Sequence, residues 1–444
     1  MNRWIRMILF AVFAIGFLIS APLVVLYTAG YRYQIGSNRV VKAGILSVTS
    51  TPRGATITLN GQRDDKRTPA VIDNLFPGDV KIQISKPEYS SWEKTLSIRS
   101  NESTFIPNAI LFLDGTPTQS VDQIPLAVSV STNTSRFAYL TNTKGTLELW
   151  VRDSAFLQDR SIFKESVHPS SSYTLSWSPD EQYVLLTEST SKKSVTLINV
   201  QEETVISLPS RDATDVHFDI GSNHHILYRL NKEWKIFGID GDISFPKKLI
   251  ADDLRRRNSR LIAVQSSTDQ SVVSYMDDTG VASIIAYLPF GTYRFIEAPS
   301  TRISLIETAT HHLVILDPDQ AEPLRLNEEV RFSEWSPKGD RLLLSNGFDA
   351  KIFDINSGQM QTITRFSEPL TAIGWYPIGD EILFSQGTTL SAIELDERDV
   401  RNKTVLVNDF IIQSFWITKD GSKLSFFGKK SDGPTTLYER KLQK

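Results

Sequence analysis

The sequence contains no cysteine among its 444 residues. Disulfide bonds, thiolate metal sites and cysteine nucleophiles are therefore excluded. There is also little excess of either charge, since 51 acidic residues stand against 48 basic ones and the net charge is −3. The first 42 residues hold five basic residues and no acidic one, so the remainder of the chain is mildly acidic. An acidic surface repels phosphate backbones, and we therefore expect no nucleic-acid partner.

The short motifs of common active sites are missing as well. There is no Gly-x-Ser-x-Gly elbow, no glycine-rich phosphate loop and no His-Glu-x-x-His motif. We therefore predict a protein that is not an enzyme, with no catalytic, cofactor-binding or metal-binding residues and no cofactor. The alternative is a glycan hydrolase or lyase, which would need several carboxylates with perturbed pKa values to converge.

Five local clusters have residue types that occur in metal or anion sites. His224-His225 and His311-His312 each offer at most one metal ligand, because adjacent strand residues point to opposite faces. Asp277-Asp278-Thr279-Gly280 and Asp317-Pro318-Asp319 lack the ligand pattern of a calcium loop and are interpreted as turns. Arg255-Arg256-Arg257 is the densest basic run. We interpret it as a solvated loop rather than a site for a polyanion.

Long apolar runs are absent except at the N-terminus, where Met7–Ala29 is almost unbroken. A helix of about 20 apolar residues crosses a bilayer, whereas the core of a signal peptide is shorter. Pro22 and the large Ile19 make a poor cleavage site after Ala21. We therefore predict a cytoplasmic tail over residues 1–6 and an uncleaved, single-pass signal anchor over residues 7–29. The bulk of the chain would then lie outside the cell membrane.

After a linker over residues 30–42, residues 43–113 alternate apolar and polar residues in short runs separated by turn residues. Gly44–Ser50 and Val80–Ser85 are typical of half-buried strands, and Asn60-Gly61 is a strong hairpin signal. Proline, glycine and asparagine supply the backbone angles of such turns. The pattern predicts a small β domain with no catalytic chemistry of its own.

This segment resembles the PEGA domain, a small β-sandwich of envelope proteins. The matching motifs run in consistent order and are Thr51-Pro52-Arg53-Gly54-Ala55, Leu59-Asn60-Gly61, Thr68-Pro69, Leu75-x-Pro77-Gly78 and Lys86-Pro87-x-Tyr89. Arg53 replaces the glutamate of the motif, and Glu88 stands where glycine is usual. Both are turn positions, so the resemblance implies a sandwich scaffold and an envelope location without functional residues to transfer.

From residue 114 onward one unit recurs with a period of about 40 residues. Trp335-Ser336-Pro337, Trp375-Tyr376-Pro377 and Trp416-Ile417-Thr418 each precede an apolar run, and Trp177-Ser178-Pro179 does so earlier. A fixed period with strand–turn–strand content predicts a radial or stacked repeat. We interpret the tryptophans as packing between neighbouring sheets, and stacking on carbohydrate as the alternative.

Four strands in each repeat of this length are typical of a β-propeller blade. The units resemble those of the TolB-type propeller family, with WD40-like repeats. The sequence therefore predicts a mainly β protein: a transmembrane helix, a PEGA-like β-sandwich, and a propeller over residues 114–444 with seven or eight blades, eight being favoured. Pro117–Gln123 would supply the missing strand of the last blade and close the ring.

Together these features predict a membrane-anchored, extracytoplasmic binding or scaffold protein. Its propeller would be presented to an envelope protein, a peptide or a cell-wall glycan. Besides the glycan hydrolase or lyase, a structural component of the cell surface is an alternative. Because one propeller fold hosts many functions, the partner has to be sought in the site itself.

Overall fold

The computed structural model describes residues 3–34, 39–121, 123–131, 136–153, 159–167, 172–189, 194–210, 212–219, 224–239, 249–257, 260–277, 281–430 and 432–444. They divide into two compact units. Unit 1 comprises Met1–Gly115, Ile393–Thr404 and Gln443–Lys444, and unit 2 comprises Thr116–Ala392 and Val405–Leu442. The sequence assigns all of residues 114–444 to the propeller, whereas the structure groups residues 114–115, Ile393–Thr404 and Gln443–Lys444 with unit 1.

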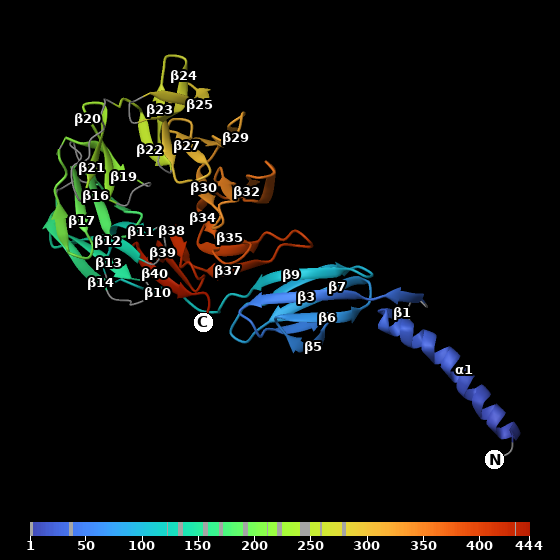
Figure 1. Ribbon diagram of the computed structural model, residues 1–444. Coiled ribbons are helices and arrows are strands. Elements are labelled where there is room, and N and C mark those ends of the chain that lie inside the picture. The colour runs from blue at the N-terminus through green and yellow to red at the C-terminus, as the bar shows by residue number, and fades with distance from the viewer. Residues whose placement is uncertain are drawn as a thin grey trace. The chain divides into compact units, whose positions relative to one another are not determined.

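Helix α1 (Arg3–Thr28) begins unit 1 (Figure 1). Trp4–Thr28 has a mean hydropathy of 2.7 and is not buried, so by length and composition it is able to cross a membrane. Beyond the helix, the Arg32 guanidinium lies 3.8 Å from the centre of the Tyr27 ring and donates to the Tyr27 carbonyl. A cation at this end of a helix is favourable, because the last carbonyls are unpaired.

The strands of unit 1 are β1 (Tyr31–Gln34), β2 (Arg39–Lys42), β3 (Gly44–Thr51), β4 (Thr56–Leu59), β5 (Gln62–Arg67), β6 (Ala70–Leu75), β7 (Gly78–Ser85), β8 (Trp92–Ile98) and β9 (Ser103–Ile110). Strands β1 and β2 pair with each other, so the expected linker carries a hairpin. The others form the sheets β6-β3-β9 and β5-β4-β7-β8. One core of alternating residues, among them Leu46, Ile57, Ile82 and Leu96, is shared by the two sheets. This is the predicted sandwich.

Two turns of the sandwich explain features of the sequence. Asn60 and Gly61 have φ angles of 48° and 82°, the left-handed pair that a tight hairpin requires. Glu88, which replaces the usual glycine, also has a positive φ of 69°. Glycine adopts this region without steric cost, whereas a residue with a Cβ atom does so less readily. The family's glycine therefore reflects backbone geometry.

Unit 1 also buries a lysine that the sequence pattern did not single out. Lys94 lies on the inner face of β8, and its side chain is fully buried. Its Nζ atom lies 2.5 Å from Oε1 of Glu394 and donates to the Asp396 carbonyl at 2.8 Å. Trp92 Nε1 donates to the other oxygen of Glu394 at 2.8 Å. The charge of Lys94 is therefore matched by residues about 300 positions away in the chain.

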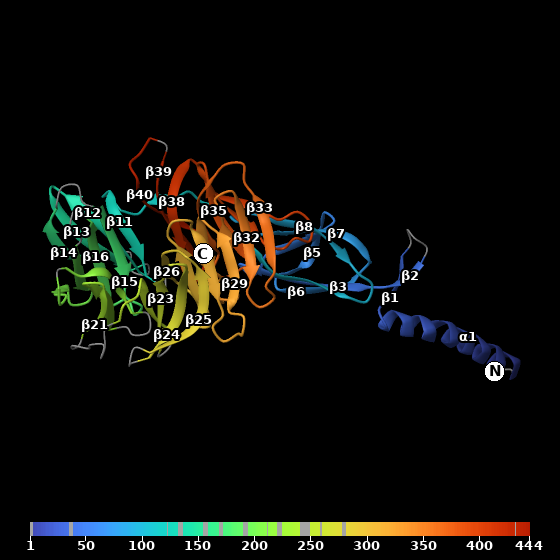
Figure 2. The same ribbon diagram turned by 90° about the horizontal axis from the view of Figure 1, so that it is seen from above.

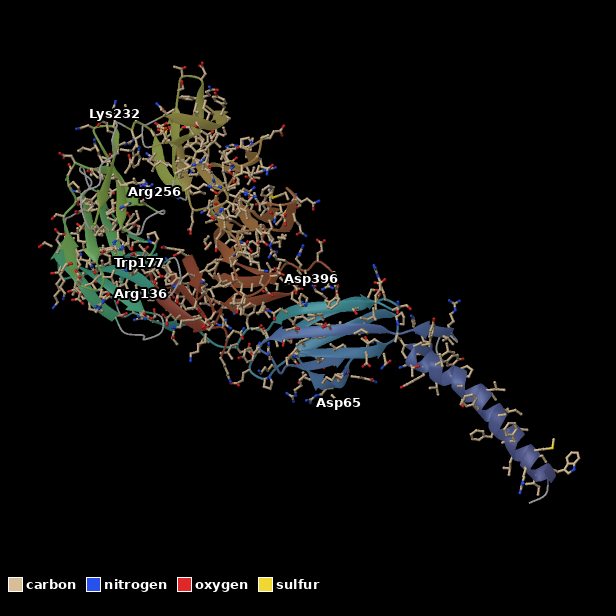
Figure 3. All side chains as sticks on the ribbon, in the orientation of Figure 1. Asp65, Arg136, Trp177, Lys232, Arg256 and Asp396 are labelled. Atoms are coloured by element: carbon tan, nitrogen blue, oxygen red, sulfur yellow. The ribbon has the colours of Figure 1, made fainter. Side chains whose placement is uncertain are left out.

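Asp396, labelled in Figure 3, completes this cluster. Burial alone would raise the pKa of its carboxyl, but hydrogen bonds from Arg398 and the nearby charge of Lys94 lower the pKa to about 2. Asp396 therefore stays ionised at any pH near neutrality. These contacts explain why Ile393–Thr404 belongs to unit 1.

Unit 2 is built from short antiparallel sheets. Its strands are β10 (Thr118–Gln119), β11 (Pro125–Val130), β12 (Arg136–Thr143), β13 (Thr146–Asp153), β14 (Asp159–Ser166), β15 (Ser172–Trp177), β16 (Tyr183–Ser189), β17 (Ser194–Asn199), β18 (Thr204–Ile206), β19 (Thr214–Phe218), β20 (His225–Leu230), β21 (Glu233–Gly238), β22 (Asp253–Arg257), β23 (Arg260–Ser266), β24 (Gln270–Met276), β25 (Ala282–Pro289), β26 (Tyr293–Ile296), β27 (Ile303–Glu307), β28 (His312–Leu316), β29 (Leu324–Glu329), β30 (Phe332–Trp335), β31 (Arg341–Ser345), β32 (Asp349–Asp354), β33 (Met360–Arg365), β34 (Leu370–Trp375), β35 (Glu381–Gln386), β36 (Thr389–Glu394), β37 (Lys403–Val407), β38 (Phe410–Ile417), β39 (Lys423–Lys430) and β40 (Thr436–Lys441). Within the described ranges they make eight sheets, one with three strands and seven with four. Because segments between the strands lie outside those ranges, the number of blades stays a prediction.

The sheets of unit 2 stand side by side around a common centre, and the view from above shows the same succession (Figures 1 and 2). Sheets that follow each other in the chain share apolar cores, from β11–β14 through to β30–β33. The last sheet in turn packs against the first, where Phe137 and Tyr139 of β12 meet Leu437 of β40. Each sheet therefore buries both faces against its neighbours, as in a β-propeller.

The ring closes as the sequence predicts. Strand β10 pairs with β40, placing Thr118 opposite Glu439 and Gln119 opposite Tyr438. The order of the last sheet is β10-β40-β39-β38, so its outer strand comes from the beginning of unit 2 and its other three from the end. The prediction that Pro117–Gln123 supplies the fourth strand is confirmed. One sheet thus joins the two ends of unit 2 by backbone hydrogen bonds.

The recurring tryptophans do lie between sheets, but one of them is displaced. Trp177 Nε1 donates to the Ser129 carbonyl of the preceding sheet at 3.1 Å, and Trp375 Nε1 donates to the Glu334 carbonyl at 3.0 Å. One backbone hydrogen bond closes the turn of each of these repeats, from an amide to the carbonyl five residues later. In three repeats the donor directly follows the tryptophan, and the bonds are Ser178 to Tyr183, Ser336 to Arg341 and Tyr376 to Glu381. In the last sheet the same bond runs from Thr418 to Lys423.

In the last sheet it is therefore Ile417, before Thr418, that holds the tryptophan position. Aligning Trp416 with the other tryptophans was wrong by one residue. A shift of one residue turns a side chain to the opposite face of a sheet. Trp416 accordingly packs on Phe137 of the first sheet, with ring centres 5.5 Å apart.

We predict that Trp177→Phe lowers the free energy of unfolding of unit 2 by about 2 kcal/mol, because the Ser129 carbonyl loses its partner inside the protein. Trp416→Phe is the matched control, since none of the hydrogen bonds found in the described residues comes from its ring, and it should cost less than about 1 kcal/mol. Urea unfolding of the full chain in detergent measures both values. Equal losses would contradict the assigned register.

We predict that Glu394→Gln destabilises β8 by about 3 kcal/mol, because the buried Lys94 loses its nearest counter-ion and keeps only the Asp396 carboxylate at 3.5 Å. The matched control is Glu93→Gln, which breaks the exposed pair of Lys81 and Glu93 (2.6 Å) and should cost less than about 1 kcal/mol. Amide hydrogen exchange over Trp92–Ile98 reports the local free energy of opening. The Lys94→Met/Glu394→Gln variant keeps an acceptor for Trp92 and should recover most of the loss, and a failure to recover would argue against an electrostatic cause.

Candidate functional site

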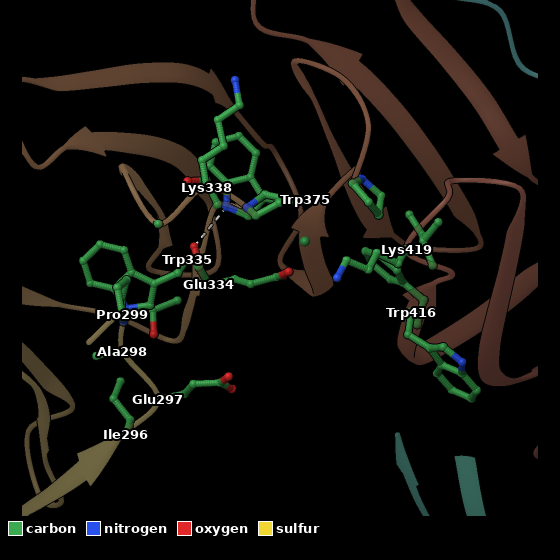
Figure 4. A pocket seen from close by; sticks show the side chains of 18 residues that line it. Ile296, Glu297, Ala298, Pro299, Glu334, Trp335, Lys338, Trp375, Trp416 and Lys419 are labelled. Carbon is green, nitrogen blue, oxygen red and sulfur yellow. Dashed lines mark hydrogen bonds between the residues drawn. The ribbon is translucent and has the colours of Figure 1, made fainter. Parts of the chain in front are cut away.

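A cavity of about 930 Å³ opens where the first strands of four consecutive sheets end (Figure 4). Strands β26, β30, β34 and β38 contribute, together with the turns that follow them. Its lining includes three tryptophans, two carboxylates and two lysines; these are Trp335, Trp375, Trp416, Glu297, Glu334, Lys338 and Lys419. We call it the axial cavity. The repeat places structurally equivalent turns side by side. Sequence differences between these turns therefore determine which side chains line the cavity.

Glu334 is the central acidic group of the axial cavity. It directly precedes Trp335 on β30, and its carboxyl points into the cavity (Figure 4). The corresponding residue on the next sheet is Gly374, and a Cβ atom there would lie 2.7 Å from Oε2 of Glu334. The absence of a side chain at Gly374 therefore leaves the space that the Glu334 carboxyl occupies.

The pKa of Glu334 is raised to about 7. The main cause is desolvation by the surrounding protein; the negative charge of Glu297 adds to it, and a backbone hydrogen bond from Trp375 opposes it. Glu334 nevertheless remains exposed to water within the open cavity. Its proton can therefore exchange with solvent, and the side chain titrates in the neutral range.

Glu297 enters the cavity through a change in the repeat. Glu297-Ala298-Pro299, directly after β26, corresponds to Trp335-Ser336-Pro337, whose tryptophan is the last residue of β30. A carboxylate thus stands where this repeat unit would carry its packing tryptophan. Because the negative charge of Glu297 disfavours ionisation of Glu334, the site favours either protonation of Glu334 or a bound cation.

The two lysines at this cavity point in different directions in Figure 4. The Lys419 ammonium points across the cavity toward the Glu334 carboxyl, whereas Lys338 points away from it. No ion pair within 4.0 Å joins Lys419 to Glu334 in the described part of the chain. The cavity thus keeps a carboxylate that an incoming cationic group can reach, between aromatic walls that suit cation–π contact.

The clusters weighed from the sequence do not form this site. Among the described residues there is no group of three or more His, Asp or Glu side chains that could hold a metal. His225 lies 4.0 Å from Asp219 and His224 lies 3.7 Å from Asp180, and His311 occupies a turn with a φ of 59°. Asp278-Thr279-Gly280 lies outside the described residues.

Two interpretations of the sequence need correction or addition. Arg255–Arg257 is not a solvated loop but part of β22, the first strand of its sheet, because Asp253–Arg257 pairs in register with Arg260–Val264. Glu334 was missed altogether. Its one signal in the sequence is its place directly before a repeat tryptophan, where the next unit has Gly374.

Comparisons with known proteins agree with this architecture. Residues 43–108 match the model of the PEGA domain. Among solved structures, one titled as the eukaryotic initiation factor has a TM-score of 0.51 and 12% identity, over 75% of this chain and 93% of that one. Sqt1 of Saccharomyces cerevisiae (TM-score 0.48, 9% identity, 74% and 99% covered) and the Dos1 propeller (0.48, 13%, 73% and 93%) are also similar.

No curated protein matches the chain in a sequence search. At identities this low, similarity to solved structures speaks for the fold alone. The fold itself rests on the shared cores and the closing strand pair described above. The TolB-like assignment of the repeats and the envelope location stay predictions. The chain joins a PEGA domain, matched over residues 43–108, to a β-propeller.

Proposed function

We propose that this protein is a membrane-anchored, extracytoplasmic scaffold whose propeller binds a protein partner at the axial cavity. Helix α1 would hold it in the cell membrane with a short cytoplasmic N-terminus. The observation that carries the proposal is the pair Glu334 and Glu297 between tryptophan walls in a cavity of about 930 Å³. Such a site fits a lysine or arginine side chain of the partner.

The chemistry of the cavity favours this kind of ligand. A cation placed between Glu297 and Glu334 relieves their mutual repulsion and gains charge-assisted hydrogen bonds. The ring of Trp335 adds apolar contact, and tryptophan and arginine dominate the binding energy of many protein interfaces. A neutral glycan would gain the stacking but would leave the repulsion in place.

The proposal predicts partner binding that depends on pH through Glu334. Above about pH 7 the carboxyl is ionised and attracts a cation, and below it the proton removes that attraction. Using the full chain in detergent as bait against solubilised envelope proteins, we expect capture to strengthen from pH 6 to pH 8. Glu334→Gln should bind at least about tenfold more weakly at pH 8 and lose this pH dependence.

Glu329→Gln, which changes an exposed carboxylate on β29, is the matched control and should behave as the wild type. Capture that is equal in wild type and Glu334→Gln would show that the partner binds elsewhere on the protein. Retention on purified cell-wall glycan instead of protein would favour the glycan alternative.

The same carboxylates support a second candidate, a glycan hydrolase. Glycosidases use one protonated and one ionised carboxyl, and a raised pKa keeps the acid protonated near neutrality. This candidate predicts that the full chain releases soluble fragments from cell-wall glycan and that Glu334→Gln and Glu297→Gln each abolish the release. If wild type and both variants release equally little, the hydrolase is excluded and the binding role stands alone.

A further inference from the structure

A second cavity, of about 280 Å³, lies between the sheets β22–β25 and β26–β29. Four of the twelve residues that line it are arginines, and none is acidic. Arg255, Arg256 and Arg257 come from β22, and Arg302 precedes β27. We call it the arginine cavity. Apolar residues, including Ile262, Phe295 and Ile303, form the rest of its wall.

Three of the four arginines already have carboxylate partners. Their nearest ion pairs are Arg256 with Asp219 at 2.8 Å, Arg302 with Asp317 at 3.2 Å, and Arg257 with the exposed Asp319 at 3.4 Å. Arg257 also donates to the Ser300 carbonyl and to the Tyr275 hydroxyl. These guanidinium groups are thus fixed in place by the protein, which limits the entropy that a ligand would have to remove.

Arg255 differs from the other three. Within the described residues it has no carboxylate oxygen within 4.0 Å, and its Nε atom donates no hydrogen bond. Burial lowers the pKa of its guanidinium, although the more distant charges of Asp253, Glu297 and Asp219 partly oppose this. The protein therefore holds a cation in a poorly hydrated place without a direct counter-ion, which is costly for the unliganded state.

A further donor of the arginine cavity is unsatisfied, because Nε of Arg302 has no hydrogen-bond partner among the described residues. Buried polar atoms are rarely left without hydrogen bonds, and each such case requires an explanation. Nε of Arg255 and Nε of Arg302 can only donate, so the missing partner is an acceptor.

We propose that the arginine cavity binds an oxyanion, either a phosphate or a carboxylate group, carried on a small apolar body. The anion accepts hydrogen bonds from Arg255 and supplies the missing counter-charge. Phe295 and Ile303 contact the apolar part. The volume of about 280 Å³ exceeds what a single water needs, so an oxyanion with an attached ring can be accommodated. The two cavities share Ile296, Ala298 and Pro299, but this proposal does not depend on the function proposed for the axial cavity.

The repeat itself explains why this space exists. Two other junctions between sheets are bridged by a tryptophan, Trp177 in one and Trp375 in the other. At the junction between β22–β25 and β26–β29, the residue in that place is Glu297, which is smaller and charged. The unit thus loses a packing side chain and leaves room beside Arg255.

Isothermal titration calorimetry of the full chain in detergent tests the proposal, with phenyl phosphate and benzoate as probes at constant ionic strength. We expect saturable binding of at least one probe, weakened at least about tenfold in Arg255→Met, which removes the charge and keeps the length. Arg365→Met, at an exposed arginine on β33, is the matched control and should bind as the wild type. The tighter probe identifies phosphate or carboxylate as the preferred group.

Thermal unfolding without a probe should leave Arg255→Met at least as stable as the wild type, because an unpaired buried charge is removed. Absence of binding by the wild type up to about 10 mM of either probe would overturn the proposal, as would equal affinity in Arg255→Met.

Discussion

The propeller depends on the packing of each sheet between its two neighbours. A sheet of four short strands cannot bury both faces by itself, so each apolar cluster of unit 2 is shared by two sheets. Such an array leaves its two end sheets with an open face unless they meet. The pairing of β10 with β40 and the contact of Phe137 with Trp416 join them. Stability and closure are therefore properties of the whole ring, and no single unit has them alone.

This packing leaves the turns at the ends of the first strands free to vary. The tryptophan, serine and proline of the repeat secure several of the sheets, and two departures from the repeat change the space and charge at its turns. Glu297 in place of a tryptophan and Gly374 beside Glu334 are such departures. The axial cavity and the arginine cavity share the turn after β26. One atypical unit thus contributes to both candidate sites, with opposite charge preferences.

The buried charged groups of the two units differ in whether an opposite charge lies close to them. In unit 1 the ammonium of Lys94 has a carboxylate, a carbonyl and a second carboxylate around it, so its burial is matched. In unit 2 Arg255 has only distant carboxylates, and Glu334 has a like charge nearby. A matched pair holds structure together, whereas an unmatched charge in a cavity stabilises whatever brings the opposite charge.

The sequence by itself determined the features that depend on near neighbours in the chain. The apolar run of Met7–Ala29, the Asn60-Gly61 hairpin, the repeat period and the closing strand over Pro117–Gln123 all follow from local pattern and spacing. The tertiary structure alone decided the face on which Trp416 lies, the pairing of Lys94 with Glu394, and the meeting of Glu297 with Glu334. The physical reason is that a shift of one residue reverses a strand side chain, and contacts between distant segments leave no periodic trace in the sequence.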